Sequence, residues 1–203
     1  MKTTTHFATR TATRTAAVTV SALAATLLAA CGSMSGMKSM DMSMKDSMMY
    51  SQAMLPTAVQ VPAGNKVAME TVGVGEITYA CSPKKDMAGQ FEWVFAGPDA
   101  KLNDRSGKQV GKYYGPPATW ESMDGSKLTG AQVAVSPSGA GNIPLQLVKA
   151  NPAMGMGAMS GVTYIQRVAT KGGVAPAMPC DAGTAGSKQI VKYQADYIFY
   201  KAI

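Results

Sequence analysis

The stretch Val191–Ala202, VKYQADYIFYKA, alternates between two kinds of side chain along most of its length. One set of alternate positions holds aromatic and small apolar residues, namely Tyr193, Ala195, Tyr197 and Phe199. Successive side chains of a β-strand point to opposite faces, and aromatic residues favour strands. The stretch therefore predicts a long strand with one face in a hydrophobic core.

The same two-residue period recurs in three other stretches. They are GEITYAC (75–81) with Ile77, Tyr79 and Cys81, QFEWVFA (90–96) with Phe91, Trp93 and Phe95, and GVTYIQRVAT (161–170) with Tyr164, Gln166 and Val168. Clusters of glycine, proline, asparagine and aspartate separate these stretches, and no window of twelve residues shows a helical apolar stripe. We expect an all-β antiparallel sandwich or barrel-like single domain with long loops, spanning residues 55–203.

The first 30 residues have the order of a secretory signal. A basic, threonine-rich start precedes the apolar run Ala16–Ala30, which is too short to span a bilayer comfortably. The junction of Leu28, Ala29, Ala30 and Cys31 resembles the bacterial lipobox, in which the cysteine becomes the lipidated first residue. The alternative is an ordinary signal peptide with an incidental cysteine. Gly32 after the cysteine favours the outer membrane, with the domain facing the periplasm.

Residues 31–54 are rich in methionine and serine and have no apolar period, which indicates a flexible tether. Thioethers are soft ligands that suit Cu(I), and the spacings here include M-x-M and M-x-x-M. The tract therefore has three alternative roles: a tether alone, a tether that also binds copper, or a tether whose methionines are reversibly oxidised and so consume oxidants. The methionines concerned are Met34, Met37, Met40, Met42, Met44, Met48 and Met49.

Charge and histidine content exclude several classes of function. Residues 55–203 carry fourteen basic and ten acidic residues, a net +4, without the dense basic stripe that nucleic acids require. The single histidine, His6, lies in the signal, so a mature chain has no histidine-based triad or metal site. A polysaccharide enzyme acting through two carboxylates is an alternative. Its candidates are Glu92, Glu121, Asp124 and Asp196, although a salt bridge or hydrogen bond, for example to Arg167, explains Asp196 more simply.

Export also bears on Cys81 and Cys180, because the compartment outside the cytoplasm is oxidising. Two thiols in one exported domain most simply form a disulfide. A free catalytic thiol is the weaker alternative, since a mature chain has no histidine to activate it.

The stretch YYGPPATWE (113–121) places aromatic residues in a proline-rich connection that cannot be a central strand. We therefore expect Tyr113, Tyr114 and Trp120 to line a surface ligand pocket, with Glu121 beside them. Core packing is the better explanation for Trp93 and Tyr197, which sit in alternating runs.

Several stretches together resemble the DUF3455 family of exported proteins, found in bacteria and fungi. They are GEITYAC, FEWVFAGPDAKL, ATWESMDGSKLTG, VTYIQRVATKGGVAPAMPC and VKYQADYIFYK. The resemblance implies a compact β-rich secreted domain in which Cys81 and Cys180 correspond to the paired cysteines, and it implies no activity. The chain departs from the family pattern at Tyr113, where a histidine is usual, and at Leu145, where a tryptophan is usual.

Taken together, the sequence predicts a lipid-anchored β-domain of the cell envelope that binds an unknown ligand or protein, or has a structural role, rather than an enzyme. Its partners would be the membrane, through the lipid, and that envelope component. The main alternative is a periplasmic lipoprotein that binds copper or buffers oxidants through its methionine tract.

Overall fold

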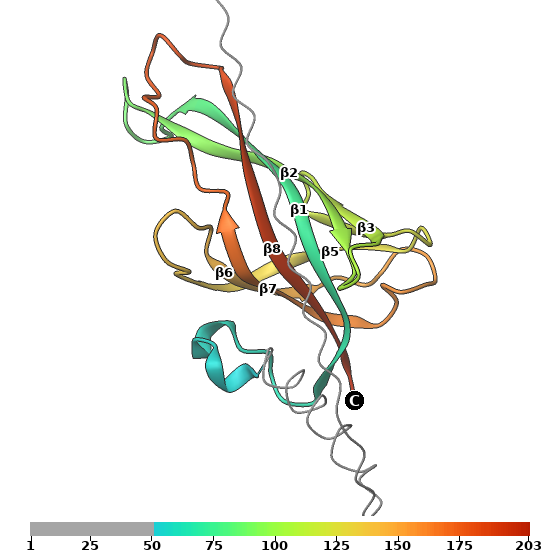
Figure 1. The fold of residues 1–203 in the computed structure, drawn as a ribbon. Helices are drawn as coiled ribbons and strands as arrows, with labels where there is room; N and C mark the ends of the chain where they lie inside the picture. The colour runs from blue at the N-terminus through green and yellow to red at the C-terminus, as the bar shows by residue number, and fades with distance from the viewer. Residues whose placement is uncertain (1–50) are drawn as a thin grey trace, which may run out of the picture. The chain divides into compact units, whose positions relative to one another are not determined.

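The computed structural model describes residues 51–203, so the proposed signal, Cys31 and Met34–Met49 lie outside the described residues. Eight antiparallel strands, each hydrogen-bonded to the next, form a closed barrel in which β8 returns to pair with β1 (Figure 1). The strands are β1 Asn65–Pro83, β2 Phe91–Asn103, β3 Gln109–Tyr114, β4 Thr119–Ser122, β5 Lys127–Ser136, β6 Leu145–Ala150, β7 Val162–Gly172 and β8 Lys188–Ala202. The all-β antiparallel prediction is confirmed, and its barrel form is the one observed.

Aromatic and aliphatic side chains fill the barrel. The alternating positions of β8 that the sequence marked, Tyr193, Ala195, Tyr197 and Phe199, all point into this core and are buried. Tyr113 stacks on Trp120 with ring centroids 4.7 Å apart, and the ring of Tyr197 lies 5.0 Å from Tyr113. Because large rings occupy the interior, ligand sites must be sought on the outer surface.

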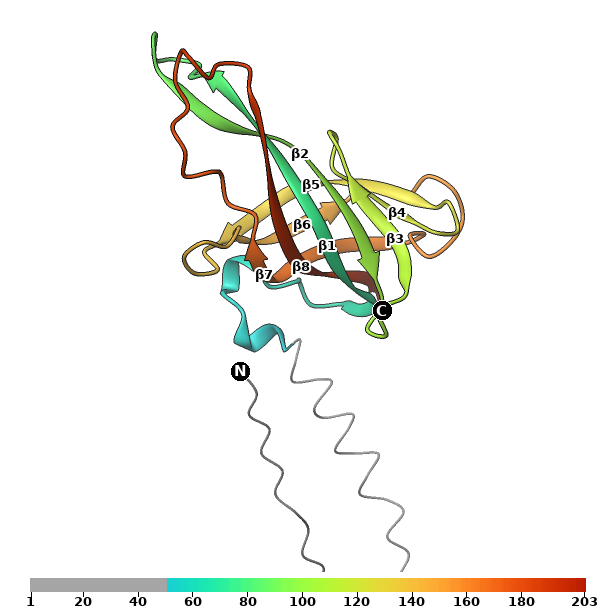
Figure 2. The ribbon, with the colours of Figure 1, turned by 45° about the horizontal axis from the view of Figure 1, so that its top comes forward.

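Two short 3₁₀ turns, η1 Gln52–Met54 and η2 Thr57–Val59, belong to an N-terminal strap, residues 52–61, that packs on the outside of the barrel (Figure 2). The fully buried Gln166 of β7 donates to the carbonyl of Val59 at 2.6 Å, and Gln52 donates to the hydroxyl of Tyr200 at 2.8 Å. The expected tether ended at Met54, whereas Gln52 already makes specific contacts with the domain. None of the helices within residues 51–203 has the length and apolar character needed to cross a membrane.

At one end of the barrel, β1 and β2 continue past their neighbours. The end of β1, the start of β2 and the start of β8 form a three-stranded sheet, and residues 173–187 run beside it (Figures 1 and 2). We call this projection, Tyr79–Phe95 with residues 173–191, the arm. A disulfide joins Cys81 to Cys180 within it, as predicted. The indole of Trp93 also donates to the carbonyl of Met178 at 2.9 Å.

Candidate functional site

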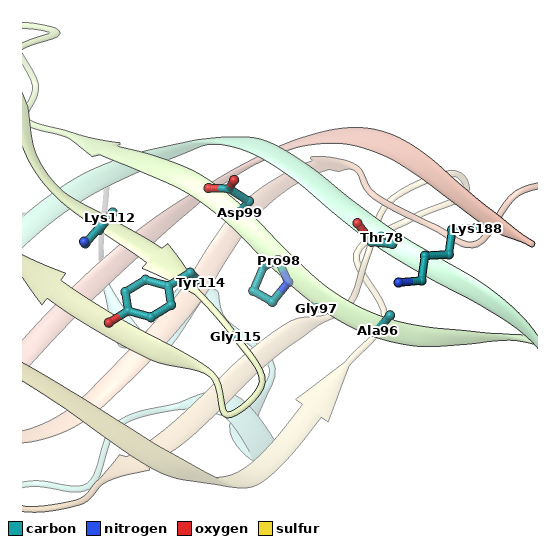
Figure 3. A pocket seen from close by; sticks show the side chains of 9 residues that line it. All are labelled: Thr78, Ala96, Gly97, Pro98, Asp99, Lys112, Tyr114, Gly115 and Lys188. Carbon is teal, nitrogen blue, oxygen red and sulfur yellow. The ribbon is translucent and has the colours of Figure 1, made fainter.

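A groove of about 500 Å³ lies on the outer surface where the arm leaves the barrel (Figure 3). Residues from four strands and from the connection after β3 line it. They are Thr78 of β1, Ala96, Gly97, Pro98 and Asp99 of β2, Lys112, Tyr114 and Gly115 of β3 and its following turn, and Lys188 of β8.

Two glycines allow the groove to form. Residues of β2 skip one position relative to β1 beside Thr78, which leaves a bulge at Ala96. A side chain on Gly97 would place its Cβ 2.2 Å from the carbonyl oxygen of Gly115, and one on Gly115 would meet the carbonyl oxygen of Pro117 at 2.5 Å. Glycine is the residue that permits such close approach of two backbones. The β3–β4 connection can therefore lie directly against the bulge and form one wall.

Tyr114, Glu121 and Lys112 form a connected polar cluster beside the groove. The Tyr114 hydroxyl donates to a Glu121 carboxylate oxygen at 2.6 Å, and the Lys112 ammonium lies 3.3 Å from the other oxygen. Lys112 also lies over the Tyr114 ring, 5.2 Å from its centroid. The hydrogen bond to the carboxylate raises the pKa of Tyr114. The same bond, supported by Lys112, lowers the pKa of Glu121. The cluster thus holds a fixed ring and a fixed carboxylate at the surface.

Asp99 and Lys188 differ from that cluster. Among residues 51–203, neither side chain has a hydrogen-bond or ion-pair partner, and Asp99 is exposed. Figure 3 shows the two charged groups apart from each other, with Pro98 and Thr78 between them. A groove with a free carboxylate, a free ammonium and a small apolar floor is suited to a ligand that carries charges of both signs.

The structure separates the four residues predicted to form a surface pocket. Tyr114 and Glu121 lie at the groove or beside it, as expected. Tyr113 and Trp120 are 5% and 1% exposed and stack inside the barrel, so their expected place in a surface pocket is corrected. The reason is that Tyr113 and Trp120 are paired residues of β3 and β4, and their strand neighbours Tyr114 and Glu121 point to the opposite face.

The structure also shows where the four candidate carboxylates lie. Asp196 accepts from Arg105 at 2.9 Å, not from Arg167, because Arg167 is opposite Tyr197 in the β7–β8 register and so points to the other face of the sheet. Asp124 is held in the β4–β5 turn, Glu92 lies on the arm, and Glu121 is in the cluster described above. Within residues 51–203, no three histidine, cysteine, aspartate or glutamate side chains gather in a way that could hold a metal ion.

Sequence reasoning missed Thr78, Gly97, Asp99 and Lys188, since none of them stands out in its own stretch. The pair Gly97-Pro98 inside a strand pattern was the available signal, because glycine and proline within a strand mark a bulge or an edge.

Fold and site together define a small antiparallel barrel with a filled interior, a disulfide-linked arm and an outer groove. The chain belongs to the family described as "Protein of unknown function (DUF3455)", whose model matches residues 62–201. The search of curated proteins found no match, and the search of solved structures found none either. The family match covers the barrel and the arm.

Proposed function

We propose that this protein is a lipid-anchored binding module of the cell envelope, and that its ligand site is the groove beside Tyr114. The observation that carries the proposal is that Asp99 and Lys188 each lack an ion-pair partner among residues 51–203. They lie on either side of Pro98 in a groove of about 500 Å³. Charged groups without partners at a preformed groove supply binding contacts without first breaking contacts of their own.

The ligand class follows from this charge arrangement together with the proposed location. Lys112 also lines the groove, but it is paired with Glu121. The unpaired groups are the Asp99 carboxylate and the Lys188 ammonium, and they suit a ligand that carries an amine and a carboxylate at a distance from each other. Peptides cross-linked into the bacterial cell wall have that chemistry, and a lipoprotein facing the periplasm would meet them. Tyr114 would add an aromatic surface against which an apolar part of the ligand can pack.

Binding to purified cell-wall sacculi tests the ligand site. The full exported chain is mixed with sacculi and sedimented, and the bound fraction is measured as a function of protein concentration. We expect Asp99→Asn and Lys188→Gln each to weaken binding roughly two- to fivefold, the scale of one solvent-exposed ionic contact. Asp86→Asn and Lys149→Gln are matched controls, because both positions are exposed and neither lines the groove. Absence of binding, or equal binding by all four variants, would refute the groove as the ligand site.

The lipid anchor has an independent test. Radiolabelled palmitate supplied to expressing cells should label the chain, and Cys31→Ser should remove the label. An unlabelled parent chain in the soluble periplasmic fraction would contradict the anchor while leaving the groove proposal intact.

A further inference from the structure

The outer edge of β2 in the arm has no neighbouring strand. β3 pairs only with Asp99–Asn103 of β2, whereas β1 pairs with β2 from Asn103 back to Phe91. The segment Phe91–Ala96, which we call the open edge, therefore has β1 on one side. No strand and no side chain among residues 51–203 hydrogen-bonds to the backbone of its other side.

The pairing pattern identifies which backbone groups of the open edge point outward. The N–H of Cys81 donates to Ser187 at 2.9 Å, and the carbonyl of Cys81 accepts from Gly186 at 2.9 Å. Both groups of Cys81 thus face away from β2, so Cys81 and Trp93, its opposite residue, form a non-hydrogen-bonded pair. Opposite residues alternate between the two kinds of pair. Phe91, Trp93 and Phe95 consequently present their N–H and carbonyl groups at the open edge.

The residues of the open edge do little to block further pairing. Natural edge strands are protected by lysine, proline or inward-pointing charges. The arm's other outer strand, the start of β8, has Lys188, and Lys192 follows directly after the arm. The open edge has one charged residue, Glu92, while Val94 and Phe95 are 42% and 50% exposed. A strand with free backbone groups and exposed apolar side chains is suited to β-augmentation, in which another strand adds to the sheet.

We propose that the open edge pairs with the open edge of a second copy of this chain and forms a two-fold dimer. In such an antiparallel pair the two-fold axis is perpendicular to the sheet, and each side chain lies opposite one on the same face. Positions of like parity must therefore face each other. The two edges can satisfy this condition because they are identical.

The register follows from charge and from the number of hydrogen bonds. Centring the pair on Glu92 would place two carboxylates directly opposite each other, which is unfavourable. Centring it on Val94 would bring Phe91 opposite Gly97, which is buried against Gly115. Centring it on Trp93 pairs Phe91 with Phe95 of the second copy and uses the outward groups of all three aromatic residues. In this register Glu92 lies opposite Val94 of the second copy, twice by symmetry.

The pairing of Glu92 with Val94 can be tested, because the effect of a charge at position 94 on dimer affinity depends on the register. Val94→Glu would place two acidic pairs across the interface, and Val94→Lys would place two pairs of opposite charge there. By sedimentation of the full exported chain in detergent, we expect Val94→Lys to dimerise at least roughly tenfold more tightly than Val94→Glu. Ile190→Glu and Ile190→Lys are matched controls, because Ile190 is exposed on β8, on the other side of β1. Thermal unfolding monitored by circular dichroism verifies that each variant is folded.

Disulfide trapping in the membranes of expressing cells tests the same register without purification. Chains carrying Glu92→Cys and Val94→Cys, with different tags, should form a mixed disulfide when co-expressed. Neither should form one with itself, because the corresponding positions are too far apart in this register. Ile190→Cys co-expressed with Glu92→Cys is the control for random collision.

The outcomes decide between occupants of the open edge. Tighter dimers of Val94→Lys together with the mixed disulfide support self-pairing. A monomer at all concentrations, equal trapping of the Ile190→Cys control, or trapping of Val94→Cys only to a different envelope protein would overturn it.

Discussion

In the barrel every strand has a neighbour on both sides, whereas in the arm the sheet of β2, β1 and β8 ends without a further strand at β2. The barrel encloses large rings such as Trp120 and Tyr197, which are at most 1% exposed. The arm exposes Met87, Val94, Phe95 and Ile190, each at least 42% accessible. Strand closure thus gives the barrel a core, while the arm has too little sheet to cover its own apolar side chains.

The arm therefore depends on a covalent link where the barrel depends on packing. The disulfide Cys81–Cys180 joins the β1 strand to the segment that runs beside it, and the Trp93 indole holds that segment at Met178. The groove lies where these two regions meet, next to Gly97 and Gly115. The closed and packed barrel therefore positions the site, whereas the less protected arm offers the surfaces available to partners.

The largest expected effect comes from removing a buried ring from the core of the barrel. Trp120→Ala should lower the free energy of unfolding by about 3–5 kcal/mol, because it removes a fully buried ring that stacks on Tyr113 and meets Tyr197 edge-on. Urea unfolding followed by circular dichroism measures this loss. Met123→Ala, 69% exposed in the neighbouring turn, should change the value by less than about 0.5 kcal/mol.

A second substitution at the same residue sharpens the interpretation. The Trp120 indole N–H is the one buried side-chain polar atom among the described residues without a hydrogen-bond partner. Trp120→Phe removes that unpaired donor and keeps a ring, so its loss should be less than half that of Trp120→Ala. Equal losses for the two variants would mean that ring stacking is not what stabilises this part of the core.

Removing the disulfide of the arm should have a smaller effect on the free energy of unfolding. Cys81→Ala combined with Cys180→Ala should cost about 2–4 kcal/mol, since the disulfide closes a loop with a sequence separation of 99 residues. Limited proteolysis of the folded chain should then cleave first within residues 173–187, because that segment has lost its covalent link to β1 while the barrel strands keep their pairing. Cleavage spread evenly through the barrel would show that the native arm does not depend on the disulfide for its order.

The sequence predicts the individual strands better than it predicts how they close into a barrel. Strand stretches such as Val191–Ala202 were predictable because their period and their aromatic residues act locally. Closure into a barrel was not, because it depends on β8 pairing with β1 across more than a hundred residues. A sandwich and a barrel have the same local pattern, so no strand by itself distinguishes them.

The site was predicted less well, for a related reason. Tyr113 and Tyr114 are adjacent in a stretch interrupted by prolines, and the sequence alone does not show that strand structure continues through both. Since β3 ends only at Tyr114, the first ring points into the core and the second points outward. Met159 is similar: it is fully buried, although its glycine-rich stretch has no period that would indicate a core position.

The smallest expected effect concerns Asp124, which joins the β4–β5 turn to the loop before β7. One carboxylate oxygen accepts from the Ser126 hydroxyl at 2.6 Å and from the Ser126 N–H at 2.9 Å, and the other accepts from the Ala158 N–H at 2.7 Å. These hydrogen bonds, the one from the Ser126 hydroxyl above all, lower the pKa of Asp124 to about 2. Folding therefore favours the ionised form of this carboxyl relative to the unfolded chain, in which its pKa is about 3.9.

The sign of the pH dependence follows from that lowered pKa. The stabilisation by Asp124 is present above about pH 4 and is lost as the pH falls from there through 2. Asp124→Asn should thus destabilise the chain at pH 7, and the difference from the parent should shrink towards pH 2, as urea midpoints at a series of pH values would show. Asp86→Asn, an exposed carboxyl in the β1–β2 turn, is the matched control. A difference that stayed constant down to pH 2 would mean that Asp124 acts through its shape and not through its charge. The loop before β7 would then be held in place by the hydrogen bond from the Met159 N–H to the Ser126 hydroxyl and by the burial of Met159.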